Sequence, residues 1–184
     1  MKKNLILLFV LVGALLGGCA VAPHAPVALG SNALVSEKGT VGVAMTALPK
    51  ADTSFPGAGC LLCMAAASAA NSSLTAYTRT LPEDDISNIK QSVVELLRSE
   101  GIHAIVLPEN INIDKLNKFP TEGPNLAKKD FRPFKKKYSI DKLLVINITE
   151  LGFLRTYQAY IPSSDPKAYM EGAGFLVNLD NNAY

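Results

Sequence analysis

The sequence predicts an α/β (α+β) fold: a small mixed sheet with two helices packed on it, βαβαβ followed by an antiparallel C-terminal meander. Three observations predict it. Short apolar runs at 41–48, 103–108 and 141–148 have the character of strands. Amphipathic stretches at 82–100 and 130–138 lie between them. From residue 153 onward, apolar stretches alternate with Pro- and Gly-containing turns. Strands separated by a helix favour parallel pairing through a crossover connection.

The first strand and the first helix have clear boundaries. Val41, Val43 and Met45 share one face of a strand that ends before Pro49. The helix predicted over 82–100 has Pro82 and three carboxylates in its first turn, where they oppose the positive end of the helix dipole. Gly101 supplies its C-terminal stop. Its apolar residues recur at helical spacing: Ile86, Ile89, Val93, Leu96 and Leu97. Four of them are expected to be buried against the sheet: Ile86, Ile89, Val93 and Leu97.

The second half continues the alternation. Residues 103–108 form a short buried strand and 110–124 a polar loop. A helix over 130–138 places Phe131, Phe134 and Tyr138 on one side, and 141–148 is the strongest strand of the chain. Strands over 153–161 and 168–179, joined by a turn at 162–166, complete the meander. Residues 180–182 signal another turn, so the chain is either complete here or a fragment that stops as a further strand begins.

The N-terminus has the pattern of an export signal. Lys2 and Lys3 precede an apolar run over 5–16, and small residues stand directly before Cys19. The run is shorter than the roughly 20 apolar residues that span a bilayer. We therefore expect a signal peptide over 1–18, a flexible tether over 19–40 and a single domain over 41–184. Lys2 and Lys3 account for the whole net charge of +2, so the exported part is neutral and a nucleic-acid partner is not expected.

Cys60 and Cys63 form a CxxC pair with Gly57 and Gly59 before it and a run of helix-forming residues after it. A helix N-terminus at Cys60 would favour the thiolate, which is the basis of redox-active CxxC sites. The apolar neighbours Leu61 and Leu62 would disfavour the thiolate if the segment packs inside. We expect a structural disulfide or two packed thiols, with thiol–disulfide exchange as the alternative.

The stretch around this pair contains no charged residue from 53 to 78. Its small side chains favour a tightly packed internal helix. The alternative is a segment that contacts a membrane or a partner protein, and the sequence leaves the role of 53–78 open.

A cluster of basic residues follows the polar loop, with Asp130 among them. A solvated helix face is the favoured interpretation, and a patch for an anionic partner such as lipid head groups is the alternative. The cluster comprises Lys128, Lys129, Arg132, Lys135, Lys136 and Lys137. The tyrosines at 157, 160 and 169 either pack across the last strands or, if exposed, serve protein recognition.

Catalytic and metal motifs are missing from the sequence. There is no GxSxG, HExxH or Walker-type loop, and the acidic run at 83–85 is explained by a helix first turn. Cys60, Cys63 and His103 would supply three of the four ligands of a structural zinc site, with no fourth in view. We expect no catalytic residue, no metal and no cofactor.

The sequence Leu16-Gly17-Gly18-Cys19 resembles the lipobox of bacterial lipoproteins. That resemblance implies a covalent lipid on Cys19 as the mature N-terminus. Since Ala20 rather than Asp follows, it also implies anchoring in the outer membrane, facing the periplasm. The junction of helix 131–138 with strand 141–146 resembles small periplasmic domains: the amino-terminal domain of TolB and the curli-secretion and penicillin-binding-protein-activator lipoproteins.

Those resemblances imply a non-catalytic interaction or assembly module of the cell envelope. Its expected partners are the membrane, through the lipid on Cys19, and another envelope protein. The oligomeric state stays open. The alternative function is that of a thiol–disulfide redox protein that uses Cys60 and Cys63.

Overall fold

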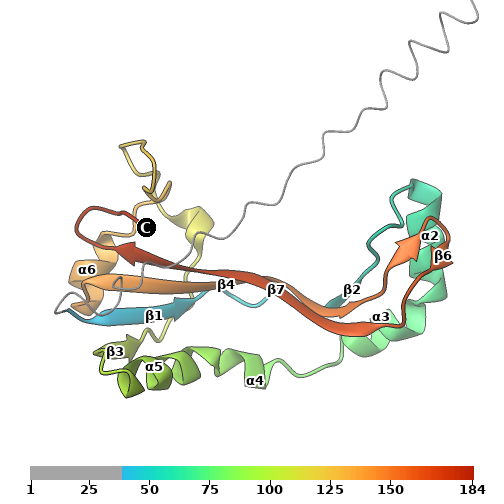
Figure 1. The fold of residues 1–184 in the computed structure, drawn as a ribbon, viewed down its shortest axis with the longest axis horizontal. Coiled ribbons are helices and arrows are strands. Elements are labelled where there is room, and N and C mark those ends of the chain that lie inside the picture. Colours follow the sequence, from blue (N-terminus) through green and yellow to red (C-terminus); the bar gives the residue numbers. More distant parts are fainter. Residues whose placement is uncertain (1–38) are drawn as a thin grey trace, which may run out of the picture. The chain divides into compact units, whose positions relative to one another are not determined.

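The structure is a computed structural model that describes residues 39–184 (Figure 1). The expected signal peptide, Cys19 and most of the expected tether lie outside the described residues.

A five-stranded mixed sheet forms the centre of the fold and confirms the predicted α/β class. β1 and β2 pair with successive parts of one edge of β4, at residues 142–146 and 152–154. β3 pairs with the free edge of β1, and β7 pairs along the other edge of β4. β1 is parallel to β3 and β4, β2 is parallel to β4, and β7 is antiparallel to β4. The bounds are β1 Val41–Met45, β2 Asp52–Ser54, β3 Ala104–Val106, β4 Lys142–Leu154 and β7 Lys167–Asn178.

One face of β1 and β3 is covered by α5 (Ile89–Ser99), which follows the short helix α4 (Asp84–Ser87). The predicted helix over 82–100 is therefore interrupted at Asn88. The buried residues of α5 are Val94 and Leu97, so the expected burial of Leu97 is confirmed. The expected residues Ile86, Ile89 and Val93 are half-buried, and Leu96 is 63% exposed. Gly101 has a φ of +80° and ends α5 as predicted, because the backbone N–H groups of residues 101 and 102 reach back to the last turn.

The other face holds a second core that includes α6 (Pro133–Tyr138). Phe131 precedes the helix and is 1% exposed, packed with Ile140, Leu143 and Val177. Asn182 closes this core, since its buried side chain accepts a hydrogen bond from the Phe131 N–H and donates to two carbonyls of the preceding loop. That loop contains the 3₁₀ turn η1 (Ile113–Lys115).

The C-terminal strands differ from the prediction in their boundaries. Residues 142–148 of the predicted strand 141–148, and residues 153–154, belong to the single long strand β4, which pairs with β7 along its length. Glu150 and Gly152 interrupt the apolar pattern in the sequence, but the backbone continues past them because β2 and β7 take its hydrogen bonds on both edges. The turn between β4 and β7 carries a small hairpin, β5 (Tyr157–Gln158) and β6 (Ile161–Pro162).

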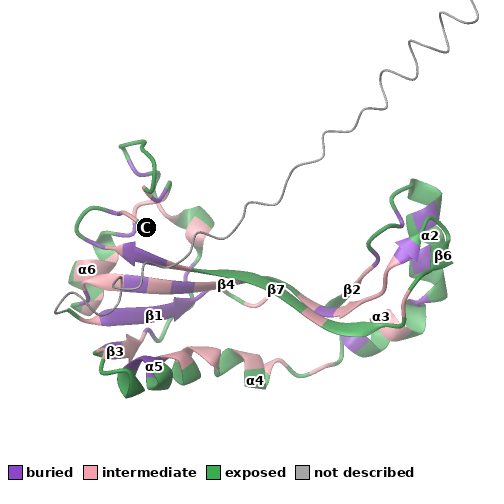
Figure 2. Cartoon of the chain, viewed as in Figure 1, coloured by how far each residue is buried: buried purple, intermediate pink, exposed green. Residues whose placement is uncertain are grey.

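The uncharged stretch 53–78 forms two helices, α2 (Leu61–Ala70) and α3 (Ser72–Thr78). Figure 2 shows most of α2 as exposed, and only Cys63 and Ala67 of this helix are buried. The expectation of a tightly packed internal helix is therefore wrong. Within residues 39–184, no helix is long and apolar enough to cross a membrane.

Candidate functional site at the Cys60–Cys63 disulfide

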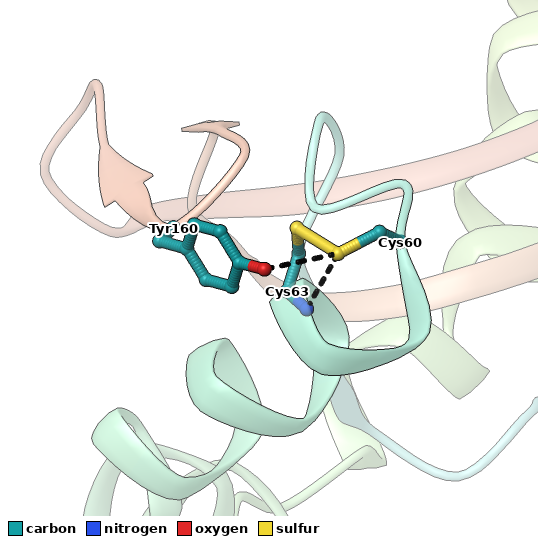
Figure 3. The surroundings of a disulfide bond; sticks show 3 residues. All are labelled: Cys60, Cys63 and Tyr160. Atoms are coloured by element: carbon teal, nitrogen blue, oxygen red, sulfur yellow. Dashed lines mark hydrogen bonds between the residues drawn. A yellow bond between two sulfur atoms is a disulfide. The ribbon is translucent and has the colours of Figure 1, made fainter.

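Cys60 and Cys63 are joined by a disulfide at the N-terminus of α2 (Figure 3). Cys60 is the N-cap residue with an extended backbone, and its Sγ accepts a hydrogen bond from the Cys63 N–H at 2.9 Å. One of the helix donors that would otherwise lack a partner is thereby satisfied by sulfur. The structure thus places this CxxC pair at a helix N-terminus, as the sequence indicated.

The two sulfur-bearing residues differ in exposure. Cys60 is exposed, whereas Cys63 is 3% exposed. Cys63 packs in a small apolar cluster with Phe55, Ala67 and Tyr157. A reagent arriving from solvent therefore meets Cys60, and the expectation that apolar neighbours would bury the whole pair does not hold for this residue.

Tyr160 lies beside the exposed sulfur. Its hydroxyl is 3.8 Å from the Cys60 Sγ, as Figure 3 shows. A disulfide sulfur carries no proton, so the hydroxyl is the donor in this long contact. Tyr160 comes from the short β5–β6 hairpin, so its contact with Cys60 brings together two segments about a hundred residues apart in sequence.

Beneath the disulfide, α2 is fixed to the end of β4 by a buried polar network. Asn71 is 4% exposed and donates to the Tyr157 hydroxyl at 2.6 Å and to the Ala67 carbonyl at 2.7 Å. Its side-chain oxygen accepts from Arg155 at 3.0 Å. The Phe55 and Tyr157 rings pack edge to face, with centroids 5.9 Å apart. These contacts hold α2 in place on the β5–β6 hairpin and the end of β4.

Large apolar side chains close to the disulfide in sequence, or next to its contact residue Tyr160, are exposed to solvent, and we call them the apolar surface. Leu61 is 88% exposed and Leu62 is 70% exposed, directly after Cys60. The set comprises Leu61, Leu62, Met64, Tyr160 and Ile161. The sequence did not reveal this surface, because leucines beside alanines have the composition of a core helix.

The stretch 53–78, which contributes Leu61, Leu62 and Met64 to the apolar surface, contains no charged residue. Arg79 and Asp52 stand at the two ends of the uncharged stretch and form an ion pair at 3.0 Å. The hydrogen bond from Arg79 lowers the pKa of Asp52, although burial opposes the shift. A cavity of about 470 Å³ lies between β2 and the two helices, with Met64 and Thr75 in its lining. This cavity therefore adjoins the apolar surface at Met64, and its lining also includes the ion pair of Asp52 and Arg79.

The basic cluster is largely neutralised by acidic neighbours. Arg132 pairs with Asp130 at 2.8 Å, and Lys137 pairs with Glu109 at 2.8 Å. Lys135 bridges Asp180 at 2.6 Å and Asp141 at 3.3 Å. Lys129 donates to two backbone carbonyls. These pairs favour the interpretation of a solvated, internally paired face. Lys128 and Lys136 complete the cluster.

The residues considered for zinc are not brought together with a fourth ligand. His103 Nδ1 lies 2.9 Å from the Thr40 hydroxyl, and the two cysteines are bonded to each other. Within residues 39–184, no group of three or more His, Cys, Asp or Glu side chains is placed to hold a metal ion.

The other tyrosines considered for recognition have different roles. Tyr157 is 6% exposed and belongs to the cluster under the disulfide. Tyr169 donates to Glu150 at 2.5 Å and is 2.9 Å from Glu171, and these carboxylates raise its pKa strongly. Of the three, Tyr160 is the one whose hydroxyl lies beside the exposed sulfur of Cys60.

No family model, curated protein or solved structure matches this chain.

Proposed function

We propose that this protein is an outer-membrane-anchored periplasmic lipoprotein that acts as a non-catalytic interaction module of the cell envelope. The anchor rests on the lipobox resemblance at Cys19. The interaction rests on the apolar surface, which is the single observation that carries the proposal. Monomeric domains rarely expose adjoining large apolar side chains unless these bind something.

A polypeptide is the partner that the apolar surface suits best. Leu61, Leu62 and Ile161 offer aliphatic contact, while Tyr160 adds an aromatic ring with a polar end, a combination enriched in protein interfaces. The Asn71 network holds the helix in place before binding, which reduces the entropy lost on association. The partner segment is therefore one that presents apolar side chains to this surface.

The test uses the full-length protein in its own envelope. The double variant L61S/L62S removes two exposed leucines that have no role in the buried cluster. Burial of one leucine in an interface is worth about 1.5–3 kcal/mol, which is roughly tenfold or more in affinity. We expect proteins that co-purify with the wild type from detergent-solubilised envelope to be lost from this variant.

The matched control is L96S on α5, where Leu96 is 63% exposed and lies outside the apolar surface. It should retain the co-purifying proteins. Equal retention by L61S/L62S and L96S would contradict the proposal.

The anchor is tested separately with C19A. This variant should incorporate no labelled fatty acid and should remain an unprocessed precursor. Labelling of C19A, or fractionation of the wild type with inner-membrane markers, would overturn the proposed location.

A further inference from the structure

We propose that the Cys60–Cys63 disulfide is a thiol–disulfide exchange site through which the protein forms a covalent link to a cysteine-containing, apolar polypeptide. Cys60 is the sulfur that is attacked, and Cys63 is the leaving and returning thiol. The partner class rests on the proposed function, whereas the exchange chemistry does not.

The difference in exposure decides which sulfur is attacked. A thiolate must approach a disulfide sulfur directly, so access selects between the two. Cys60 is exposed at the end of α2, whereas Cys63 is 3% exposed beneath it. The Phe55, Ala58, Ala67 and Tyr157 side chains that pack with Cys63 block the other approach.

The step is balanced without an external oxidant. The partner's thiol loses its proton and its sulfur bonds to Cys60 Sγ, as the Cys60–Cys63 bond breaks and its electron pair goes to Cys63. Cys63 then takes up a proton, since its apolar surroundings disfavour the charged thiolate. The products are one mixed disulfide and one thiol, and attack by Cys63 on Cys60 reverses the step.

Two further features fit this role. When the mixed disulfide is reduced and Cys60 is left as a free thiol, the helix N-terminus and the Cys63 N–H both favour a negative charge on the Cys60 sulfur. The apolar surface adjoins Cys60, with Leu61 and Leu62 next in sequence and Tyr160 3.8 Å away. A partner segment whose cysteine is flanked by apolar side chains would contact this surface while its sulfur reaches Cys60.

The chemistry is tested first with glutathione, which needs no partner. In C63S the exposed Cys60 should react with oxidised glutathione. In C60S the buried Cys63 should react at least about tenfold more slowly. Peptide mass spectrometry of the wild type in millimolar reduced glutathione should find the adduct on Cys60. Equal rates in the two variants, an adduct on Cys63, or no exchange at all would overturn the proposal.

Folding of the variants is checked by their unfolding curves, and the wild-type adduct keeps the test valid if either variant fails to fold. The substrate class is tested with two short cysteine peptides, one flanked by leucines and one by glutamates. The leucine peptide should exchange faster with the wild type. L61S should reduce the ratio of the leucine-peptide rate to the glutamate-peptide rate, whereas L96S on α5 should leave that ratio unchanged. Equal rates for both peptides would overturn the apolar partner but not the exchange. The co-purification experiment with L61S/L62S tests the proposed function, and its outcome does not bear on the exchange chemistry.

Discussion

The side-chain amide of Asn71 donates to the Tyr157 hydroxyl across 2.6 Å, and this bond ties the end of α2 to the β5 hairpin. Arg155 approaches the same amide from the other side at 3.0 Å. The exposed helix with its disulfide is thus supported by a polar group that is itself buried.

Asn71→Ala should lower the free energy of unfolding by about 1–3 kcal/mol, because it leaves the buried Tyr157 hydroxyl without its donor. Tyr157→Phe removes the same hydroxyl but leaves the Asn71 amide its bonds to the Ala67 carbonyl and to Arg155, so it should cost less. Urea unfolding of both variants measures this. A loss below half a kcal/mol in Asn71→Ala would show that the network does not support the helix.

The neighbours Leu96 and Leu97 on α5 provide a matched pair. Leu97→Ala should cost about 2–5 kcal/mol, because the side chain is 7% exposed and its removal leaves a cavity. Leu96→Ala should change stability by less than about 0.5 kcal/mol, since that side chain is 63% exposed. Denaturant unfolding compares the two variants, and similar losses would place the buried face of α5 elsewhere.

Gly57 and Gly59 differ in the backbone that they require. Gly57 has a φ of +88°, and a Cβ there would overlap the Tyr157 carbonyl, so Gly57→Ala should cost more than about 1 kcal/mol. Gly59 has nothing within 4 Å of such a Cβ, so Gly59→Ala should be nearly neutral. Thermal unfolding distinguishes them, and a neutral Gly57→Ala would mean that the loop before Cys60 can adopt another path.

Acid should destabilise the fold through Asp141. The Thr40 N–H, followed by Lys135, holds the pKa of this carboxyl below its ordinary value, so its stabilisation is present above the unfolded pKa of about 3.9 and is lost as the pH falls through the lower folded value. Asp141→Asn should therefore show a shallower loss of stability below about pH 4. Unfolding curves between neutral and acid pH test this, and unchanged acid sensitivity would assign the loss to other carboxyls.

The sequence predicted what local patterns determine. β1, β3, the first part of β4 and the stop at Gly101 follow from apolar alternation and from a glycine at a left-handed position. The continuation of β4 past Gly152 depends on β2 and β7, which are distant in sequence, so the local pattern broke where the strand did not.

The apolar surface could not be predicted for a related reason. Leu61 and Cys63 lie two residues apart in equally apolar sequence, yet one is 88% exposed and the other 3% exposed. Cys63 and Ala67 lie on the side of α2 that faces Phe55 and Tyr157, and they are buried because the helix packs there on one small cluster. Composition gives the number of apolar residues, whereas the tertiary fold decides how many are covered.

Site-specific photo-crosslinking of the full-length protein in intact envelope tests most directly whether the apolar surface binds a polypeptide. A photoreactive amino acid is placed at position 61 in one variant and at position 96 in another. We expect a discrete protein adduct from position 61 and none of the same mass from position 96. No protein adduct from position 61, adducts to lipid alone, or the same products from both positions would contradict a polypeptide-binding role for the apolar surface.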